Sequence, residues 1–106
     1  MVTEITAGQL QARRATGSAP VVLDVRENWE LGVASIPDTL HIPMNEIPAR
    51  LGELDASAEI VVMCRSGGRS LQVAQFLERN GFRSVANLTG GILAWSRDVD
   101  PSVTPY

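Results

Sequence analysis

The residues best suited to chemistry lie together in one short segment, Cys64-Arg65-Ser66-Gly67-Gly68-Arg69-Ser70. Adjacent glycines allow a loop to curl so that successive backbone N–H groups point into its centre, and such a concavity binds anions. The guanidinium groups of Arg65 and Arg69 strengthen the same positive field. A thiol in that field has a lowered pKa, and its thiolate is a nucleophile. The segment therefore predicts a reactive sulfur, Cys64, beside a receptor for an anionic substrate or a charged sulfur adduct.

The cysteine and histidine content narrows the possible chemistry. Cys64 is the only cysteine of the chain, which excludes a disulfide framework and a C-x-x-C redox pair. His41 is the only histidine, which argues against a zinc site built from cysteine and histidine, so no metal is expected. The alternative is that Cys64 is simply a small buried residue at the end of its strand, because free cysteines are often buried and inert.

A further alternative is a cysteine phosphatase of the low-molecular-weight or dual-specificity type, or an arsenate reductase of that kind. Those loops place five residues between the cysteine and the arginine that meets the phosphoryl oxygens. Here four residues separate Cys64 from Arg69, and Ser70 occupies the position of that arginine. A smaller ring of amides suits the outer sulfur of a persulfide better than a tetrahedral phosphate, so the spacing disfavours this alternative.

Rigid elements must hold such a loop in place. Before the loop, Ile60-Val61-Val62-Met63 is an apolar run of the length expected for a buried strand. After the loop, residues 70–80 have the periodicity of a helix, whose inward face would be formed by Val73, Phe76 and Leu77. In parallel sheets covered by helices, ligands bind beyond the carboxyl ends of the strands, where Cys64 is expected to lie.

The rest of the chain also alternates between predicted strands and helices. Thr6-Ala7-Gly8-Gln9 has the form of a capping box that starts a short helix. Strands are predicted at residues 21–25, 40–42 and 85–88, and helical segments at residues 47–54 and 92–95. This alternation implies right-handed crossovers, so the predicted fold class is α/β, a mostly parallel central sheet of about five strands with helices on both faces. Residues 98–106 are expected to form a loose C-terminal tail.

Length, composition and charge place the chain in a broad class. Its 106 residues are a common size for one domain, and we expect a single domain over residues 1–106. Hydrophobic residues make up 44%, charged residues 20% and the net charge is −3, which fits a globular protein and disfavours nucleic acid as a partner. No apolar run approaches the roughly 18 residues of a membrane span, and no secretory signal is recognisable, so a cytoplasmic protein is expected.

Four segments resemble motifs of the single-domain rhodanese family, which are sulfurtransferases that carry sulfane sulfur on one cysteine. Val22-Leu23-Asp24-Val25-Arg26-Glu27, with Trp29-Glu30 after it, resembles the first signature. Ile36-Pro37 and His41-Ile42-Pro43 resemble the second signature. The segment from Cys64 to Ser70 resembles the active-site loop in its six-residue form, and Gly90-Gly91-Ile92-Leu93-Ala94-Trp95 resembles the closing motif. Together the four segments span nearly the whole chain in the family's order.

The resemblance implies a rhodanese-like fold and a two-step, ping-pong cycle. Cys64 would attack the outer sulfur of thiosulfate, or of a related persulfide donor, and become a persulfide while sulfite leaves. A thiol or cyanide acceptor would then take the sulfur. No cofactor is implied. The donor anion would be bound by the other loop residues, which are Arg65, Ser66, Gly67, Gly68, Arg69 and Ser70.

The resemblance leaves the partners open. The thiol acceptor would be a small molecule or a thioredoxin-like protein. The same loop would equally serve a sulfur-relay or protein-interaction module that a partner protein loads. No exposed apolar stripe in the sequence indicates an oligomeric state.

Some residues outside the loop are candidates for supporting roles. Asp24 and Arg26 end a predicted strand and could border the site. We expect Asp24 to accept from backbone amides and Arg26 to form a structural ion pair. Trp95 is expected to pack in the core or to cover the loop, and His41 to be a hydrogen-bonded structural residue.

The sequence departs from the family in the second signature, which usually reads Gly-His-Ile-Pro-Gly-Ala. Here the segment is Ala34-Ser35-Ile36-Pro37-Asp38-Thr39. The changes at Ser35-Ile36-Pro37-Asp38 lie in a loop expected at the rim of the site, so they bear on substrate access more than on the nucleophile. Near the first signature, Trp29 is expected to pack, and Glu27 and Glu30 are expected to be solvated charges.

Overall fold

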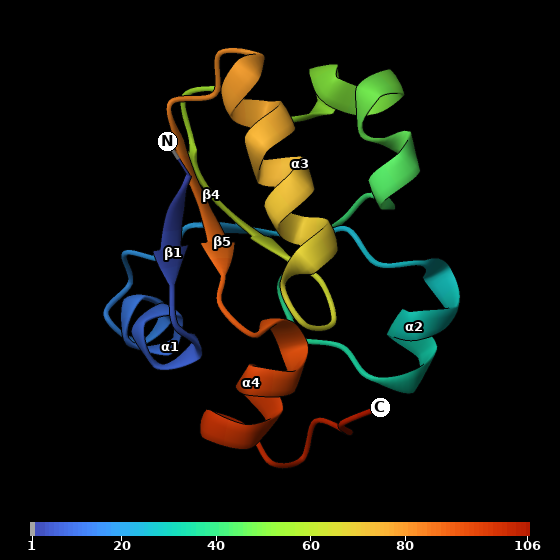
Figure 1. The fold of residues 1–106 in the computed structure, drawn as a ribbon. Helices are drawn as coiled ribbons and strands as arrows, with labels where there is room; N and C mark the ends of the chain where they lie inside the picture. The colour runs from blue at the N-terminus through green and yellow to red at the C-terminus, as the bar shows by residue number, and fades with distance from the viewer. Residues whose placement is uncertain (1) are drawn as a thin grey trace.

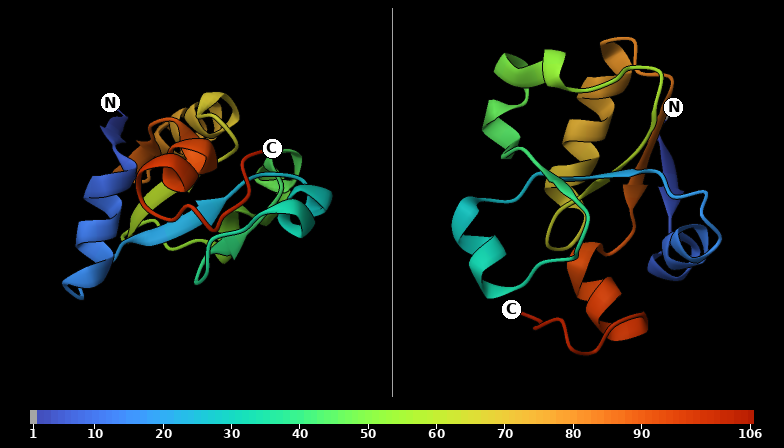
Figure 2. Two further views of the ribbon diagram at one scale, coloured as in Figure 1. Left: turned by 90° about the horizontal axis from the view of Figure 1, so that it is seen from below. Right: turned by 180° about the vertical axis from the view of Figure 1, so that it is seen from behind.

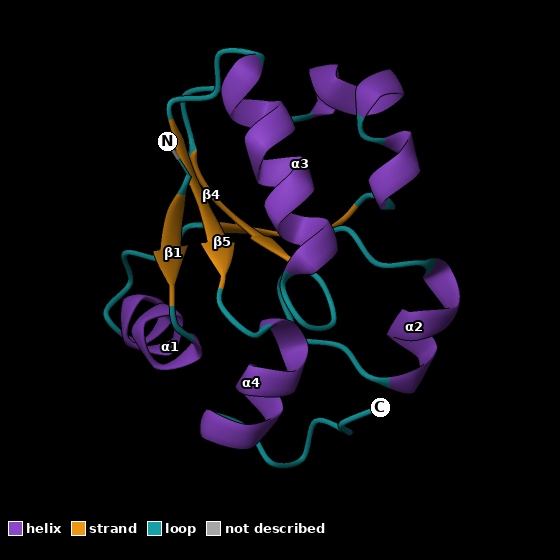
Figure 3. Ribbon diagram, in the orientation of Figure 1, coloured by secondary structure: helices purple, strands orange, loops and turns teal. Residues whose placement is uncertain are grey.

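The computed structural model describes residues 2–106. Its centre is a sheet of five parallel strands in the order β1-β5-β4-β2-β3 (Figures 1 and 3). The strands are β1 (Thr3–Ile5), β2 (Val21–Asp24), β3 (Leu40–His41), β4 (Glu59–Met63) and β5 (Ser84–Leu88). The predicted α/β class with a parallel sheet is therefore confirmed.

Within residues 2–106, four α-helices and two 3-10 helices connect the strands. They are α1 (Ala7–Ala15), α2 (Asn28–Val33), η1 (Met44–Glu46), η2 (Pro48–Glu53), α3 (Gly68–Arg79) and α4 (Gly91–Asp98). The capping box of α1 is confirmed, because the Thr6 hydroxyl accepts from the Gln9 amide while the Gln9 side chain accepts from the Thr6 amide.

The sheet is buried on both faces, as expected for a parallel sheet. On one face, Val61 of β4 belongs to a core with Leu10 of α1 and Trp95 of α4. On the other face, Val62 of β4 belongs to a core with Leu77 of α3. Successive strand residues point to opposite faces, which explains why β4 is a continuous apolar run. The prediction of helices on both faces is confirmed.

Two elements are missing from the sequence prediction because their local signals are weak. In β1, which has three residues, Thr3 and Glu4 are exposed, and in the six residues of α2 only Glu30 is buried. Neither element is long enough to show a clear hydrophobic period. The single helical segment predicted over residues 47–54 is instead two 3-10 helices. In η2 the backbone of Arg50 leaves the helical region, with φ −114° and ψ 16°.

The C-terminal tail is packed rather than loose, which corrects the prediction for residues 98–106. Asp98 is still the last residue of α4, and beyond it the chain runs back towards α2 (Figure 2). Val103 is 8% exposed and belongs to the core on the α1 and α4 side of the sheet. The tail has no regular secondary structure, so only its distant contacts show that it is ordered.

The loop between β4 and α3 lies at the carboxyl edge of the sheet, as predicted. In Figure 1 the arrowheads of β1 and β5 point towards α4, and this is the end at which β4 leads into Cys64. The helix after the loop begins at Gly68, two residues earlier than the predicted start at Ser70. Arg69 and Ser70 therefore belong to the first turn of α3.

Candidate active site

Cys64 lies inside the loop, and two polar groups lie within hydrogen-bonding distance of its sulfur. The residue is 1% exposed, and the Gly67 amide donates to its Sγ over 3.1 Å. The Ser70 Oγ lies 3.3 Å from the same sulfur. The loop turns back on itself at Gly67, whose φ of 109° is in the left-handed region that favours glycine. The curled loop expected from the two glycines is the one observed.

The pKa of Cys64 results from opposing effects. Burial raises the pKa of the thiol, because a buried charge loses its hydration. Hydrogen bonds from the Ser70 hydroxyl and from the amides of Ser70, Gly67 and Ser66 outweigh burial, so the pKa lies below its ordinary value. Hydrogen bonds to the charged form favour the thiolate, which is the nucleophilic form.

The start of α4 supports the loop from behind. The Ile92 amide donates to the Cys64 carbonyl over 2.9 Å, and the Leu93 amide donates to the Arg65 carbonyl over 3.1 Å. This close approach requires a glycine at position 91, where an added Cβ would lie 2.5 Å from both carbonyl oxygens. The Gly90-Gly91 pair of the closing motif therefore positions the cysteine loop.

Replacing Gly91 with alanine is expected to destabilise the fold by about 3 kcal/mol, since the added Cβ would push the loop backbone away and φ at this position is +59°. Urea unfolding measures the change. Gly8→Ala is the matched control, because nothing lies within 4 Å of a Cβ there. In this helical position alanine should leave stability unchanged or raise it by up to about 1 kcal/mol. Equal effects of the two substitutions would contradict this account of Gly91.

Arg69 is bound to a buried carboxylate on α2. Its Nη1 and Nη2 donate to the two Glu30 oxygens over 2.7 and 2.8 Å. Glu30 is 3% exposed, so the expectation of a solvated charge at Glu30 is wrong. The guanidinium of Arg69 lowers the pKa of Glu30 to about 2, against a partly opposing effect of burial. Glu27, in contrast, is exposed, as expected.

The lowered pKa of Glu30 predicts a loss of stability in acid. The ordinary pKa is 4.5 and the folded value is about 2, so the ion pair stabilises the fold above pH 4.5 and its contribution is lost as the pH falls towards 2. We expect a loss of about 2 kcal/mol, below the full value of the shift because Arg69 is 35% exposed and solvent screens the pair. Unfolding free energies from pH 6 to 2 measure it. Glu30→Gln is the reference, and a wild-type curve parallel to that of the variant would contradict the assignment.

Asp24 and Arg26 form a buried ion pair, as expected. Both side chains are fully buried, and the Arg26 Nη2 donates to Asp24 Oδ2 over 2.8 Å. Asp24 also accepts from the Arg26 amide over 3.0 Å, and His41 Nε2 is 2.7 Å from the Arg26 carbonyl oxygen. Within residues 2–106, the side chains of Asp24, Arg26 and His41 form no hydrogen bond with Cys64. Their observed contacts are structural.

Tyr106 in the tail contacts Arg26 and Arg65, which the sequence did not indicate. The Tyr106 hydroxyl accepts from the Arg26 Nη1 and donates to Glu30 Oε1, each over 2.8 Å. The guanidinium of Arg65 lies 5.3 Å from the Tyr106 ring centre, and its Nε donates to the Tyr106 carbonyl. Trp29, expected to pack, is 66% exposed, and its ring makes a T-shaped contact with the Tyr106 ring, with the ring centres 6.4 Å apart. Tyr106 thus contacts Arg26 directly and is connected to Arg69 through Glu30 of α2.

Two further expectations concern Trp95 and the altered second signature. Trp95 is 5% exposed and packs in the core, with Arg14 over its ring at 5.6 Å. In the altered second signature, Ala34 and Ile36 are buried, whereas Asp38 has a φ of 60°. The family pattern has glycine at that position, which suits a left-handed backbone better than a residue with a Cβ.

Asn87 is a buried polar residue that the sequence reasoning missed. It lies in β5, is 4% exposed, and its Oδ1 accepts from the Ser70 hydroxyl over 2.5 Å. The signal was present in Val85-Ala86-Asn87-Leu88, where one amide interrupts an apolar run. A polar side chain on a buried strand requires a partner, and here the partner is Ser70, which lies next to the Cys64 sulfur.

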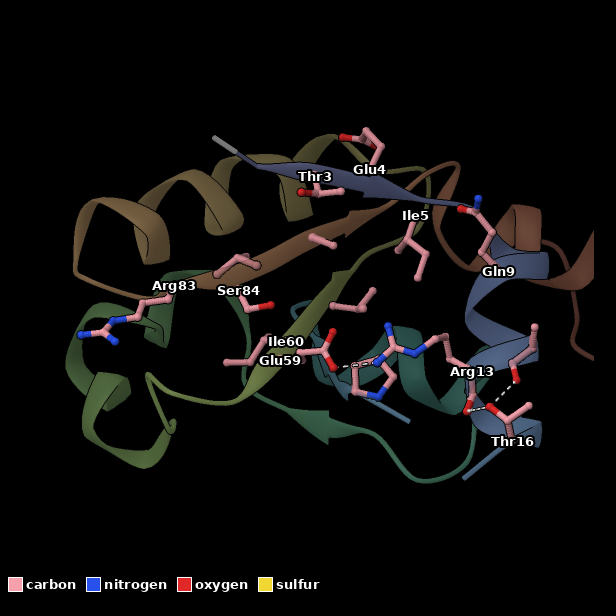
Figure 4. A pocket seen from close by; sticks show the side chains of 15 residues that line it. Thr3, Glu4, Ile5, Gln9, Arg13, Thr16, Glu59, Ile60, Arg83 and Ser84 are labelled. Carbon is pink, nitrogen blue, oxygen red and sulfur yellow. Dashed lines mark hydrogen bonds and ion pairs between the residues drawn. The ribbon is translucent and has the colours of Figure 1, made fainter. Parts of the chain in front are cut away.

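A separate cavity of about 620 Å³ is lined by residues of α1 and of the strands β1, β4 and β5 (Figure 4). Its lining includes Glu59 and Ser84, which begin β4 and β5, and the Arg13–Glu59 ion pair of 2.6 Å. The cysteine loop is not part of the lining. Among residues 2–106, no helix is long and apolar enough to cross a membrane.

The fold and loop together define a class of protein, an α/β domain with a cysteine at the carboxyl edge of a parallel sheet and a ring of amides around its sulfur. Residues 6–98 match the rhodanese-like domain family. The chain belongs to this family, which confirms the resemblance seen in its four motifs.

Several related proteins are similar to this chain over nearly their full lengths. A sulfurtransferase of Allochromatium vinosum is 40% identical over 105 residues, which cover 99% of this chain and 98% of that protein. A putative sulfurtransferase of Bacillus subtilis, YtwF, is 36% identical over 100 residues, with 94% and 96% covered. The crystal structure of a rhodanese-related protein from Thermoplasma volcanium is 31% identical and superimposes with a TM-score of 0.85, covering 98% of this chain and 99% of that one.

A different kind of relative is a putative sulfur carrier protein of Bacillus subtilis, YrkF. It is 40% identical over 75 residues, which are 71% of this chain and 40% of that protein. These likenesses support sulfurtransferase activity as the general chemistry of this chain.

Proposed function

We propose that this protein moves sulfane sulfur from thiosulfate, or from a related persulfide donor, to a thiol or cyanide acceptor through a persulfide on Cys64. The observation that carries the proposal is the donor set around the sulfur, in which the Gly67 amide lies 3.1 Å from Cys64 Sγ and the amides of Ser66 and Ser70 also lower the pKa of the thiol. Preorganised N–H donors of this kind stabilise a sulfur anion without reorganisation during the reaction.

With thiosulfate as donor, the first half-reaction balances without a cofactor. The Cys64 thiolate attacks the outer sulfur, the new Sγ–S bond forms, and the S–S bond of thiosulfate breaks. The electron pair of that bond leaves with sulfite, and the negative charge of the persulfide rests on its outer sulfur. In the second half-reaction an acceptor thiolate or cyanide attacks the outer sulfur and restores the Cys64 thiolate.

The other loop residues are proposed to bind the donor, with unequal contributions. Arg65 is exposed, so its charge is accessible to an anion, although its Nε donates to the Tyr106 carbonyl. Arg69 already donates from two nitrogens to Glu30, which neutralises part of its charge. The amides of Ser66, Gly67, Gly68 and Ser70 complete the proposed anion site.

The acceptor is proposed to be a small thiol or a thioredoxin-like protein in a cytoplasmic setting. A second candidate function is a sulfur relay, in which a partner protein loads Cys64 and a further protein unloads it. The likeness to a putative sulfur carrier favours keeping this candidate. Slow turnover with thiosulfate together with rapid loading from a persulfidated desulfurase would identify the relay.

Brief incubation with thiosulfate is expected to add one sulfur atom to the protein. Intact-protein mass spectrometry, after removal of excess reagent, measures the gain. The added sulfur should be removed by cyanide and should be absent from the Cys64→Ser variant. A folded and reduced protein that gains no sulfur from either thiosulfate or a persulfide donor would overturn the proposed function.

A further inference from the structure

A chain of hydrogen bonds runs from Cys64 to the edge strand β1. The Ser70 Oγ is 3.3 Å from Cys64 Sγ and 2.5 Å from Asn87 Oδ1. The Asn87 Nδ2 donates over 3.2 Å to the Gly67 carbonyl and over 3.2 Å to Glu4 Oε2. Ser70 is 0% and Asn87 4% exposed, so bulk water does not reach these groups freely.

The partners of Asn87 determine the orientation of its amide. A backbone carbonyl and a carboxylate can only accept hydrogen bonds, so the amide NH₂ must face Gly67 and Glu4. The reversed orientation would direct Oδ1 at these acceptors and leave them without a donor. Oδ1 therefore faces Ser70, and the Ser70 hydroxyl must be the donor in that hydrogen bond.

The direction of that hydrogen bond limits what Ser70 can do for Cys64. A serine hydroxyl has one hydrogen, so while Ser70 donates to Asn87 it presents a lone pair to the sulfur. A neutral thiol can donate its S–H to that lone pair, but a thiolate cannot. To stabilise a thiolate, the Ser70 hydroxyl must turn to Sγ, which leaves the buried Asn87 Oδ1 without a donor. A buried acceptor without a partner is costly.

We propose that Asn87 is a positioning residue, which acts through the Ser70 hydroxyl to disfavour the Cys64 thiolate relative to states in which Sγ carries no charge. Those states are the neutral thiol and, on the basis of the proposed function, the persulfide, whose charge lies on the outer sulfur. When Sγ attacks a donor sulfur and loses its charge, Ser70 can return to Asn87. The regained hydrogen bond then favours sulfur uptake.

This arrangement has a kinetic reason. The loop amides favour the thiolate, but the intrinsic nucleophilicity of a thiolate falls as its pKa falls. By opposing the amides, Asn87 keeps the sulfur basic enough to attack while it still ionises. The charged and titratable groups around the loop on its neighbouring elements are Arg65, Arg69, Glu30, Glu4 and Tyr106. All of them remain in the variants used below.

The pH dependence of Cys64 alkylation by iodoacetamide tests the proposal. Asn87→Leu has a similar volume but no acceptor, so Ser70 becomes free to donate to the thiolate. We expect the alkylation midpoint to fall by about one pKa unit. We expect the plateau rate at high pH to fall roughly threefold, because the thiolate becomes less basic. In a Ser70→Ala background, Asn87→Leu should leave the midpoint unchanged, since the hydrogen bond between Ser70 and Asn87 is already absent.

The outcomes separate the effect of Asn87 through Ser70 from a general structural effect of the substitution. A midpoint that stays or rises in Asn87→Leu, or a shift that persists in the Ser70→Ala background, would overturn the proposal. If Asn87→Leu does not fold, NMR of the wild type decides instead. The Asn87 side-chain carbonyl signal should titrate with the same midpoint as the alkylation. A signal that stays constant with pH would overturn the proposal. Alkylation reports ionisation and not sulfur transfer, so failure of the proposed function would be seen separately in the mass-spectrometric test.

Discussion

Replacing Cys64 with serine is expected to reduce sulfur transfer by at least about 10⁴-fold, since removal of an enzyme's nucleophile typically has an effect of this size or larger. A serine hydroxyl remains protonated at neutral pH and cannot form a persulfide. The smaller oxygen still fits the buried position and can still accept from the Gly67 amide, which donates to the sulfur over 3.1 Å. Thiosulfate-dependent formation of thiocyanate from cyanide measures the loss, and thermal unfolding shows that the fold persists.

The control for this substitution is a serine that lies away from the loop. Ser57→Ala is suitable, because Ser57 is exposed and, within residues 2–106, its hydroxyl hydrogen-bonds only to Asp55, two positions away. It should leave the transfer rate unchanged. Transfer by Cys64→Ser above about one hundredth of the wild-type rate would show that Cys64 is not the sulfur carrier. Hydrolysis of an aryl phosphate that depends on Cys64 would instead support the phosphatase alternative.

Replacing Asp24 with alanine is expected to destabilise the fold by about 3 to 5 kcal/mol, the range seen when one partner of a buried ion pair is removed. Both side chains of the Asp24–Arg26 pair are fully buried. Without Asp24, the guanidinium keeps the Ala34 carbonyl and the Tyr106 hydroxyl as its close partners, at 2.9 and 2.8 Å. Neither partner carries a charge that compensates the buried cation. Urea unfolding at neutral pH measures the effect.

Two comparisons test whether the unpaired charge is the cause. Asp98→Ala removes one partner of an exposed ion pair, with Arg97 72% exposed, and should cost at most about 1 kcal/mol. The double substitution Asp24→Leu with Arg26→Met should recover much of the stability lost in Asp24→Ala, because apolar pairs often replace buried ion pairs without loss. A cost below about 1 kcal/mol for Asp24→Ala would contradict a buried charge pair.

The strands on either side of the cysteine could be predicted because their burial has a local signature. β4 and β2 are buried on both faces, so each contains an apolar run, at residues 60–63 and 21–23, that is visible without knowledge of its neighbours. Short elements lack that signature. α2 has six residues, and it holds Glu30, whose partners Arg69 and Tyr106 are 39 and 76 positions away. A charge on a short helix looks the same whether it is solvated or buried against such a distant partner.

What the sequence indicated by itself was the chemistry: one cysteine, followed by glycines and arginines at the end of a buried strand, predicts a nucleophile in a loop of amides. This information is local, because the seven residues 64–70 and the strand and helix patterns on either side of them lie in one stretch of chain. The tertiary structure decided which groups surround that cysteine. Asn87 reaches it through Ser70, 17 positions away, and Tyr106 reaches Arg65 from 41 positions away. These contacts exist only because parallel strands and a returning tail bring distant segments to the same edge of the sheet.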